Sequence, residues 1–346
     1  MTRKIMKITY ISKDTSLMLR GFALLCMIVY HLYAEGNMDD AFSLCSIQGV
    51  PLASWLIRAC NPVGCYLFIS GYGLYFTSKA RPNMGGQIKR IVKLYKLYWL
   101  SLLVFVPLAC WLRPDSYPGS WTVILESITA FRTYWNGEIW FLFPYVMLVL
   151  TSKWLFRLLD RVGCLRMMAV SYVLTFAAMF LVSRYYTAFF RDHYAIYQVV
   201  LYFDCLFMFV MGAVFCKCAD REFHGPVVWL LAQPQRVLLA LFALVFLSIC
   251  IVDFSPYGQL SSLVMISLFV RIEWLGIIKR GWRLLGRYST VVWFVHTWIC
   301  YHCFKEYIYA LHYPLLMLAA TLAGSMAVGY VILRIDRWSN RLLHLR

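Results

Sequence analysis

The chain has 346 residues, of which 62% are hydrophobic and 14% are charged, and its mean hydropathy is +0.67. This composition excludes a soluble globular protein, and several apolar runs reach the roughly 20 residues that a helix needs to cross a bilayer. The net charge of +17 does not indicate nucleic-acid binding, because the basic residues alternate with the apolar runs and form no single patch.

The hydrophobic runs predict an all-α integral membrane protein with about ten transmembrane helices in a single domain over residues 1–346, without an appended soluble domain. The predicted spans are approximately 17–34, 62–78, 91–112, 137–156, 165–183, 197–216, 235–252, 258–278, 284–304 and 314–334. The two tails and the connections on their side hold 23 of the 33 basic residues. Both termini are therefore predicted to be cytoplasmic.

The first predicted helix carries an arginine and a histidine on one face. Arg20 and His31 are eleven residues apart, so at about 100° per residue their directions differ by roughly 20°. They are offset by roughly 16 Å along the axis, about half of the hydrocarbon thickness. Ionisable residues inside a membrane indicate function. The alternatives are that Arg20 anchors the helix at the interface and that His31 is a structural histidine bonded to a neighbouring helix.

The next two predicted helices contain further candidates. Ser70 and Tyr72 flank a glycine and could line a pocket, although close helix packing also explains such a glycine. Arg90, Lys93 and Lys96 share one face where the third helix begins. This basic face could bind the phosphates of a cytoplasmic ligand, or it could reflect topology and contact with anionic lipids.

Two later helices could supply partners for His31. A histidine base needs a carboxylate to orient it, and one acid that could do so is Glu138, where the fourth helix opens. His296, inside the ninth helix, could line the same cavity as His31 or be a structural histidine. Asp204 is a further acid, inside the sixth helix.

Two long connections are predicted on the outer side of the membrane. Within 35–61, the apolar stretch 52–57 is too short to span and is predicted to be interfacial, and within 113–136 a helix over 121–131 could lie at the membrane surface. Cys45, Cys60 and Cys65 could face the outside, where a disulfide could form. The twelve cysteines show no zinc-like spacing, so no metal site is expected.

Four of these segments, in this order, resemble the motifs of the acyltransferase-3 family of polytopic membrane O-acyltransferases. They are the Arg-x10-His spacing of Arg20 and His31, the stretch 66–72, the basic stretch 90–93 and the stretch 293–296. The opening of the fourth helix, 137–142, is also similar to that of the family, and this similarity makes Glu138 the first candidate for the carboxylate that orients His31. The sequence departs from the family pattern at Lys93, where arginine is usual, and at Lys96, near a usual proline. The resemblance covers about residues 15–334.

The resemblance implies a membrane O-acyltransferase, expected in the bacterial inner membrane, that moves an acyl group from coenzyme A to a hydroxyl. Acetyl-CoA is the expected donor, and a cell-surface or lipid-linked glycan is the expected acceptor. The implied roles are His31 as general base or transient acyl carrier, with Glu138 as its partner, Arg20, Arg90, Lys93 and Lys96 at the donor, and Ser70, Tyr72 and His296 in the substrate pocket. No metal and no nucleic acid are expected as partners, and a homo-oligomer is left open.

The alternative function is a secondary transporter or glycolipid flippase in which Arg20, His31 and Asp204 couple ions or substrate. The absence of an internal repeat in the sequence argues against it. A third hypothesis is a membrane protein that binds or senses glycans without catalysis. Binding of coenzyme A would distinguish the enzyme from the transporter.

Overall fold

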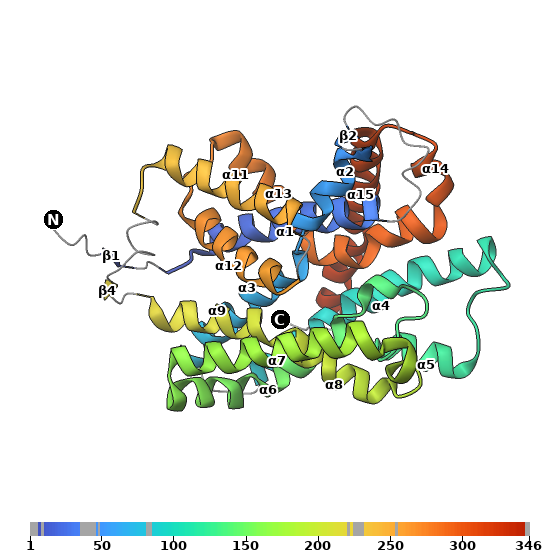
Figure 1. Ribbon diagram of the computed structural model, residues 1–346. Helices are drawn as coiled ribbons and strands as arrows, with labels where there is room; N and C mark the ends of the chain where they lie inside the picture. The colour runs from blue at the N-terminus through green and yellow to red at the C-terminus, as the bar shows by residue number, and fades with distance from the viewer. Residues whose placement is uncertain are drawn as a thin grey trace. The chain divides into compact units, whose positions relative to one another are not determined.

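The computed structural model describes residues 6–7, 10–34, 46–47, 49–80, 85–219, 222–223, 232–252 and 255–342. Helices dominate this part of the chain (Figure 1). Two pairs of very short antiparallel strands accompany them: β1 (Met6–Lys7) with β4 (Glu222–Phe223), and β2 (Ser46–Ile47) with β3 (Val50–Pro51). The chain is an all-α membrane protein.

Within the described ranges, seven helical segments are long and apolar enough to cross a membrane: Lys13–Ala34, Leu52–Lys79, Gly85–Leu112, Gly137–Val162, Cys164–Phe190, Tyr194–Cys218 and Pro314–Arg341. The elements are α1 (Lys13–Ala34), α2 (Leu52–Leu56), η1 (Ile57–Ala59), α3 (Pro62–Ala80), α4 (Gly85–Leu112), α5 (Trp121–Thr129), η2 (Gly137–Ile139), α6 (Leu142–Val162), α7 (Cys164–Tyr185), η3 (Tyr186–Phe190), α8 (Tyr194–Asp204), α9 (Leu206–Cys218), α11 (Gln235–Ile251), α12 (Ser255–Arg271), α13 (Gly276–Thr297), η4 (Trp298–Cys303), α14 (Lys305–Tyr309) and α15 (Pro314–Leu342). Each of the ten predicted spans overlaps helical segments, and their number and orientation in the membrane stay a prediction.

The eighth predicted span, 258–278, is not one helix. α12 ends at Arg271, and α13 begins at Gly276. The side chain of Gln235 stabilises this end, because its Nε2 donates to the Arg271 carbonyl at 3.3 Å and its Oε1 accepts from the Glu273 N–H at 2.8 Å. The glutamine thus supplies hydrogen-bond partners for backbone groups that have none within the helix at its end.

The sixth predicted span is also interrupted, between α8 and α9. The Thr175 hydroxyl donates to the Phe203 carbonyl at 2.7 Å and accepts from the Phe207 N–H at 3.1 Å. In an unbroken helix this N–H would bond directly to this carbonyl. The inserted hydroxyl therefore explains why the helix breaks at this point.

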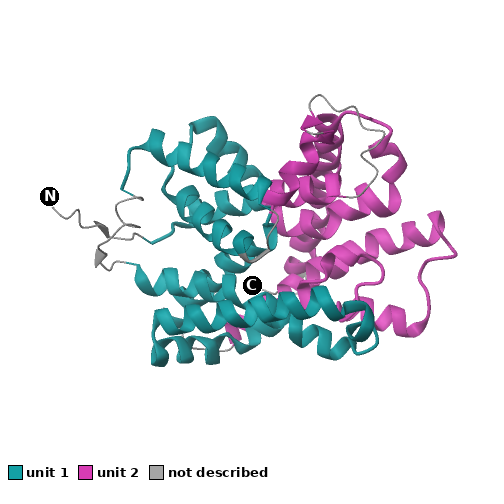
Figure 2. Ribbon diagram, viewed as in Figure 1, with its two compact units in different colours: residues 1–23, 61–83, 147–286 teal, residues 24–60, 84–146, 287–346 magenta. Residues whose placement is uncertain are grey.

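The chain divides into two compact units (Figure 2). Unit 1 comprises residues 1–23, 61–83 and 147–286, and unit 2 comprises 24–60, 84–146 and 287–346. In unit 1, α3 packs against α9 through two glycines: a Cβ on Gly71 would collide with the Phe209 carbonyl, and one on Gly212 with the Phe68 carbonyl. Gly71, which lies between the pocket candidates, is therefore required for helix packing.

In unit 2, α5 is bonded to α4 at its C-terminal end (Figure 1), and its predicted position at the membrane surface stays a prediction. Its last three carbonyls, from Ser127 to Thr129, accept hydrogen bonds from side chains of α4: Tyr98 Oη at 2.5 Å, Trp99 Nε1 at 3.0 Å and Tyr95 Oη at 2.7 Å. These donors lie 13 to 17 residues before Leu112, where α4 ends. The C-terminal end of α5 therefore lies beside the middle of α4.

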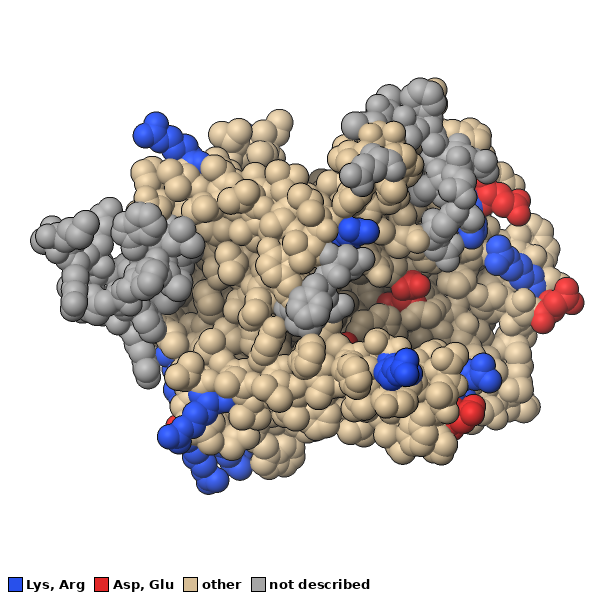
Figure 3. Space-filling model, in the orientation of Figure 1, with Lys and Arg blue, Asp and Glu red and all other residues tan. Residues whose placement is uncertain are grey.

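One face of the molecule is largely uncharged. On this face, drawn in Figure 3, residues that are neither acidic nor basic cover most of the area, and charged side chains are scattered. Large apolar side chains of the spanning helices, such as Leu103 of α4 and Leu165 of α7, are strongly exposed. Such a surface is suited to contact with lipid.

Candidate active site

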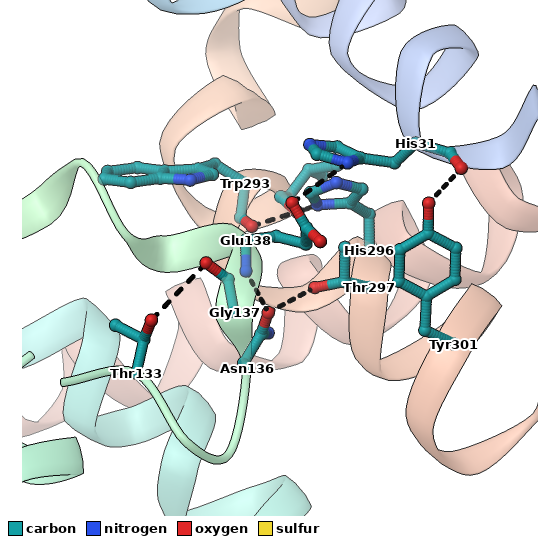
Figure 4. A network of polar contacts seen from close by, with 10 residues as sticks. His31, Thr133, Asn136, Gly137, Glu138, Trp293, His296, Thr297 and Tyr301 are labelled. Atoms are coloured by element: carbon teal, nitrogen blue, oxygen red, sulfur yellow. Dashed lines mark hydrogen bonds and ion pairs between the residues drawn. The ribbon is translucent and has the colours of Figure 1, made fainter. Parts of the chain in front are cut away.

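A histidine and a glutamate face each other in unit 2 (Figure 4). His31 lies in the last turn of α1, and Glu138 lies in η2, just before α6. His31 Nδ1 is 3.2 Å from Glu138 Oε2, and the two side chains are 12% and 30% exposed. Because an ionised carboxylate only accepts hydrogen bonds, a neutral imidazole in this contact carries its proton on Nδ1 and keeps a lone pair on Nε2. The pair thus has the arrangement that a general base requires.

A buried asparagine holds the turn that carries Glu138. Asn136 caps η2, and its Oδ1 accepts from the Glu138 N–H at 3.3 Å. The same oxygen accepts a 3.0 Å hydrogen bond from the Thr297 hydroxyl at the end of α13. Both Asn136 and Thr297 are buried. The turn with Glu138 is therefore tied to α13 (Figure 4).

Two tyrosines hold the end of α1 that carries His31. The Tyr301 hydroxyl donates to the His31 carbonyl, and the Tyr309 hydroxyl donates to the Leu32 carbonyl at 2.8 Å. The last carbonyls of a helix have no partner within it, and leaving them unpaired in an apolar environment is costly. The Tyr301 ring also stands perpendicular to the imidazole, with the ring centres 6.2 Å apart. The backbone and ring of His31 are thus both supported by η4.

A second histidine lies next to His31. The ring centres of His31 and His296 are 5.2 Å apart. His296 is fully buried, and its Nδ1 lies 3.1 Å from the Val292 carbonyl and 3.0 Å from the Trp293 carbonyl. These acceptors place the proton of its neutral ring on Nδ1, while Nε2 has no hydrogen-bond partner among the described residues.

A cluster around Tyr117 supports the segment that leads to Glu138. The Tyr117 hydroxyl donates to the Trp135 carbonyl at 3.1 Å and lies 3.3 Å from His302 Nδ1. Trp135 Nε1 in turn donates to the Pro118 carbonyl at 2.9 Å. Burial raises the pKa of Tyr117, so its phenol stays protonated and able to donate.

A model of the acyltransferase-3 family, described as an acyltransferase domain, matches residues 18–334. The chain belongs to the acyltransferase-3 family. No curated protein and no solved structure matches the chain. The family confirms the resemblance seen in the sequence, and this protein is a membrane acyltransferase. The match includes His31, Glu138 and His296, whose individual roles stay predictions.

The basic face predicted for this acyltransferase lies on α4 in unit 2. Arg90 is half-buried and Lys93 is exposed. Lys96 forms an ion pair with α15: its Nζ is 3.0 Å from Asp336 Oδ1 and donates to Asn340 Oδ1 at 2.6 Å. Lys96 therefore already has a carboxylate partner within the protein, a neighbour that the sequence did not suggest.

The other predicted site residues of the acyltransferase belong to unit 1. Arg20 is exposed on α1, which continues without a break to His31, and Ser70 is half-buried on α3. Tyr72 is buried, and its hydroxyl accepts from the Ile11 N–H at 2.8 Å. Asp204 is the last residue of α8. The predicted residues that the structure brings together are thus His31, Glu138 and His296, all in unit 2.

Three residues around the pair were not predicted: Asn136, Thr297 and Tyr301. An Asn-Gly dipeptide just before a helix is a capping signal, so Asn136 was detectable from the sequence, whereas Thr297 and Tyr301 carry no such signal. Among the described residues, no group of three or more histidine, cysteine or acidic side chains could hold a metal ion. Of the cysteines considered for an outer disulfide, Cys60 and Cys65 are buried thiols, and Cys45 lies outside the described residues.

Proposed function

We propose that this membrane acyltransferase moves an acetyl group from acetyl-CoA, on the cytoplasmic side of a bacterial inner membrane, to a hydroxyl of a cell-surface or lipid-linked glycan. The observation that carries the proposal is the contact between His31 and Glu138 in a member of an acyltransferase family. Acyl transfer to an alcohol needs a base for the hydroxyl proton, and this pair supplies one.

In the proposed reaction, His31 Nε2 removes the proton from the acceptor hydroxyl as the oxygen attacks the thioester carbonyl. The new C–O ester bond forms, the C–S bond breaks, and the coenzyme A sulfur leaves and takes the proton from the imidazolium. Glu138 keeps the imidazole in the correct tautomer and stabilises the positive charge that develops on it. No other co-reactant is required for the balance of this step.

The donor carries several phosphate charges, and the basic residues near the predicted cytoplasmic side would bind them. We assign this role to Arg20, Arg90 and Lys93, which the sequence places where α1 and α4 begin their spans. Guanidinium groups bind phosphate through two parallel hydrogen bonds, and ammonium groups bind it as point charges. Ser70, Tyr72 and His296 remain the candidates for the acceptor pocket.

The test compares the ester content of surface glycans in cells that express wild type, His31→Ala or no protein. We expect His31→Ala to lower acetyl incorporation by roughly 10²–10⁴-fold. His193→Ala, at an exposed histidine of the connection before α8, is the matched control and should leave incorporation unchanged. Undiminished acetylation by a normally inserted His31→Ala protein would reject the mechanism.

The same preparations distinguish the enzyme from a transporter. Purified protein should bind coenzyme A, as measured by calorimetry in detergent, and Arg90→Ala should weaken that binding. A transporter of glycans or ions has no reason to bind this donor. Lack of binding, together with unchanged ester content in cells without the protein, would favour the transporter.

A further inference from the structure

Two cysteines from different helices meet in unit 1. Cys164 is the first residue of α7, and Cys218 is the last residue of α9. Their Sγ atoms are 3.9 Å apart, and both side chains are partly exposed. The sulfurs are in contact, although a disulfide would require them to approach to about 2.05 Å.

The local sequence places Cys164 at this position. Gly163 has a φ of +85°, a conformation that residues with a side chain rarely adopt. Its N–H bonds to the Leu159 carbonyl at 3.1 Å, which closes α6. The glycine thus reverses the chain in a single residue, so that α7 starts directly beside the end of α6. α7 then packs along α9, which brings Cys164 to Cys218.

An ion pair joins the end of α9, which carries Cys218, to the end of α6. Lys217, next to Cys218, has its Nζ 2.7 Å from Asp160 Oδ1 and donates to the Leu159 carbonyl at 3.1 Å. The Tyr75 hydroxyl of α3 also donates to Asp160, at 2.8 Å. The ends of α3, α6 and α9 and the start of α7 therefore meet at one place. The distribution of basic residues predicts that this end of unit 1 is cytoplasmic.

We propose that Cys164 and Cys218 are a redox-active dithiol, which closes to a disulfide in an oxidising cytoplasm and reopens when the thiol pool recovers. The oxidant is a small-molecule disulfide such as oxidised glutathione. The first thiolate attacks it and releases one glutathione thiol, and the second cysteine then attacks the mixed disulfide and releases the other. Two protein thiols are oxidised and one small disulfide is reduced to two thiols, so electrons and protons balance.

The position of the two thiols favours closure. Both are at helix termini, where the backbone is less constrained than inside a helix, so small rotations and shifts bring the sulfurs together. The bond joins residues 54 positions apart and clamps α7 to α9. Because α9 packs against α3 through Gly71 and Gly212, the clamp reinforces the packing of unit 1.

The test uses the full-length protein in detergent, treated with oxidised glutathione, alkylated and digested without reductant. Mass spectrometry should find a peptide pair joined through Cys164 and Cys218, which dithiothreitol separates. A second probe, phenylarsine oxide, binds two neighbouring thiols, so wild type should retain one more equivalent than Cys164→Ser or Cys218→Ser. Cys216→Ser, which changes a buried cysteine two residues away, should keep both signals.

Three results would overturn the proposal. In the first, Cys164 and Cys218 are alkylated separately after oxidation. In the second, each retains a glutathione adduct that the other does not displace. In the third, either cysteine is joined to a different partner. These measurements use the wild-type chain, so they show whether Cys164 and Cys218 form a disulfide even if a serine variant fails to fold. They need no acyltransferase activity.

Discussion

The Thr297 hydroxyl lies 3.0 Å from Asn136 Oδ1 and donates a hydrogen bond to it, and the same oxygen accepts from the Glu138 N–H. Four residues after Thr297, the Tyr301 hydroxyl donates to the His31 carbonyl. One stretch of chain, from the end of α13 into η4, therefore holds both members of the His31–Glu138 pair. It bonds to Asn136, which holds the turn with Glu138, and to the backbone of His31. The distance between base and carboxylate depends on this stretch.

Thr297→Val should weaken catalysis without weakening donor binding. Valine has nearly the same shape as threonine but cannot donate to Asn136, so the turn with Glu138 loses a buried anchor. We expect kcat to fall by about 10- to 100-fold, because small displacements of catalytic groups are costly, while KM for acetyl-CoA stays unchanged. Steady-state kinetics of the purified protein measures both. Thr297→Ser keeps the hydroxyl and should keep the rate; equal losses in the two variants would show that the hydrogen bond is not the cause.

Glu138→Gln should remove most of the activity. Glutamine fills the same space, but its neutral amide cannot stabilise a protonated His31, and it leaves the tautomer of the imidazole unspecified. The expected loss of kcat is roughly 10²–10⁴-fold. Glu126→Gln, in α5, is the comparison, since the carboxylate of Glu126 lies 3.9 Å from Arg132 Nε. A rate near that of wild type for Glu138→Gln would exclude the carboxylate from the reaction.

Gly71→Ala and Gly73→Ala should differ in stability, although the two glycines are only two residues apart in α3. A Cβ on Gly71 meets the backbone carbonyl of Phe209, whereas one on Gly73 has nothing within 4 Å. We expect Gly71→Ala to destabilise unit 1 by about 1–3 kcal/mol or more, and Gly73→Ala to be neutral or slightly stabilising. Thermal unfolding in detergent, followed by size-exclusion chromatography, measures both. Similar unfolding temperatures for the two variants would contradict the close approach of α3 and α9.

Lys96→Met should destabilise the protein, and adding Asp336→Leu should restore stability. The single change leaves the largely buried carboxylate of Asp336 without its cation, while the double change removes both charges. The unfolding temperature measures the stability of both variants, and the affinity for coenzyme A shows whether Lys96 also binds the donor. If the double variant is stable and binds coenzyme A as wild type does, Lys96 holds α15 and takes no part in donor binding.

The helices were predictable because long apolar runs specify them almost independently of their neighbours. The breaks were not. α8 and α9 are separated by the hydroxyl of Thr175, which lies 28 residues before Phe203 in the sequence. The hydropathy of residues 197–216 does not indicate that this hydroxyl interrupts the helix. Interruptions made by a side chain from another helix depend on tertiary contacts, which a local pattern does not contain.

The candidate site could also be predicted only in part from the sequence. His31 and Glu138 could be proposed as partners because a histidine base requires a carboxylate and because the stretch 137–142 resembles the opening of the family's fourth helix. The residues that hold them, Thr297 and Tyr301, act through single hydrogen bonds to distant parts of the chain. Their residue types are common on membrane helices, so nothing in their local sequence distinguishes them from neighbours with no such contact.

The ring donors of Tyr95, Tyr98 and Trp99 pair with the last three carbonyls of α5 beside the middle of α4. The 24 residues between Leu112 and Gly137 are therefore anchored at α5 as well as at their two ends. Insertions on either side of α5 would lengthen a loop during evolution without moving this anchor.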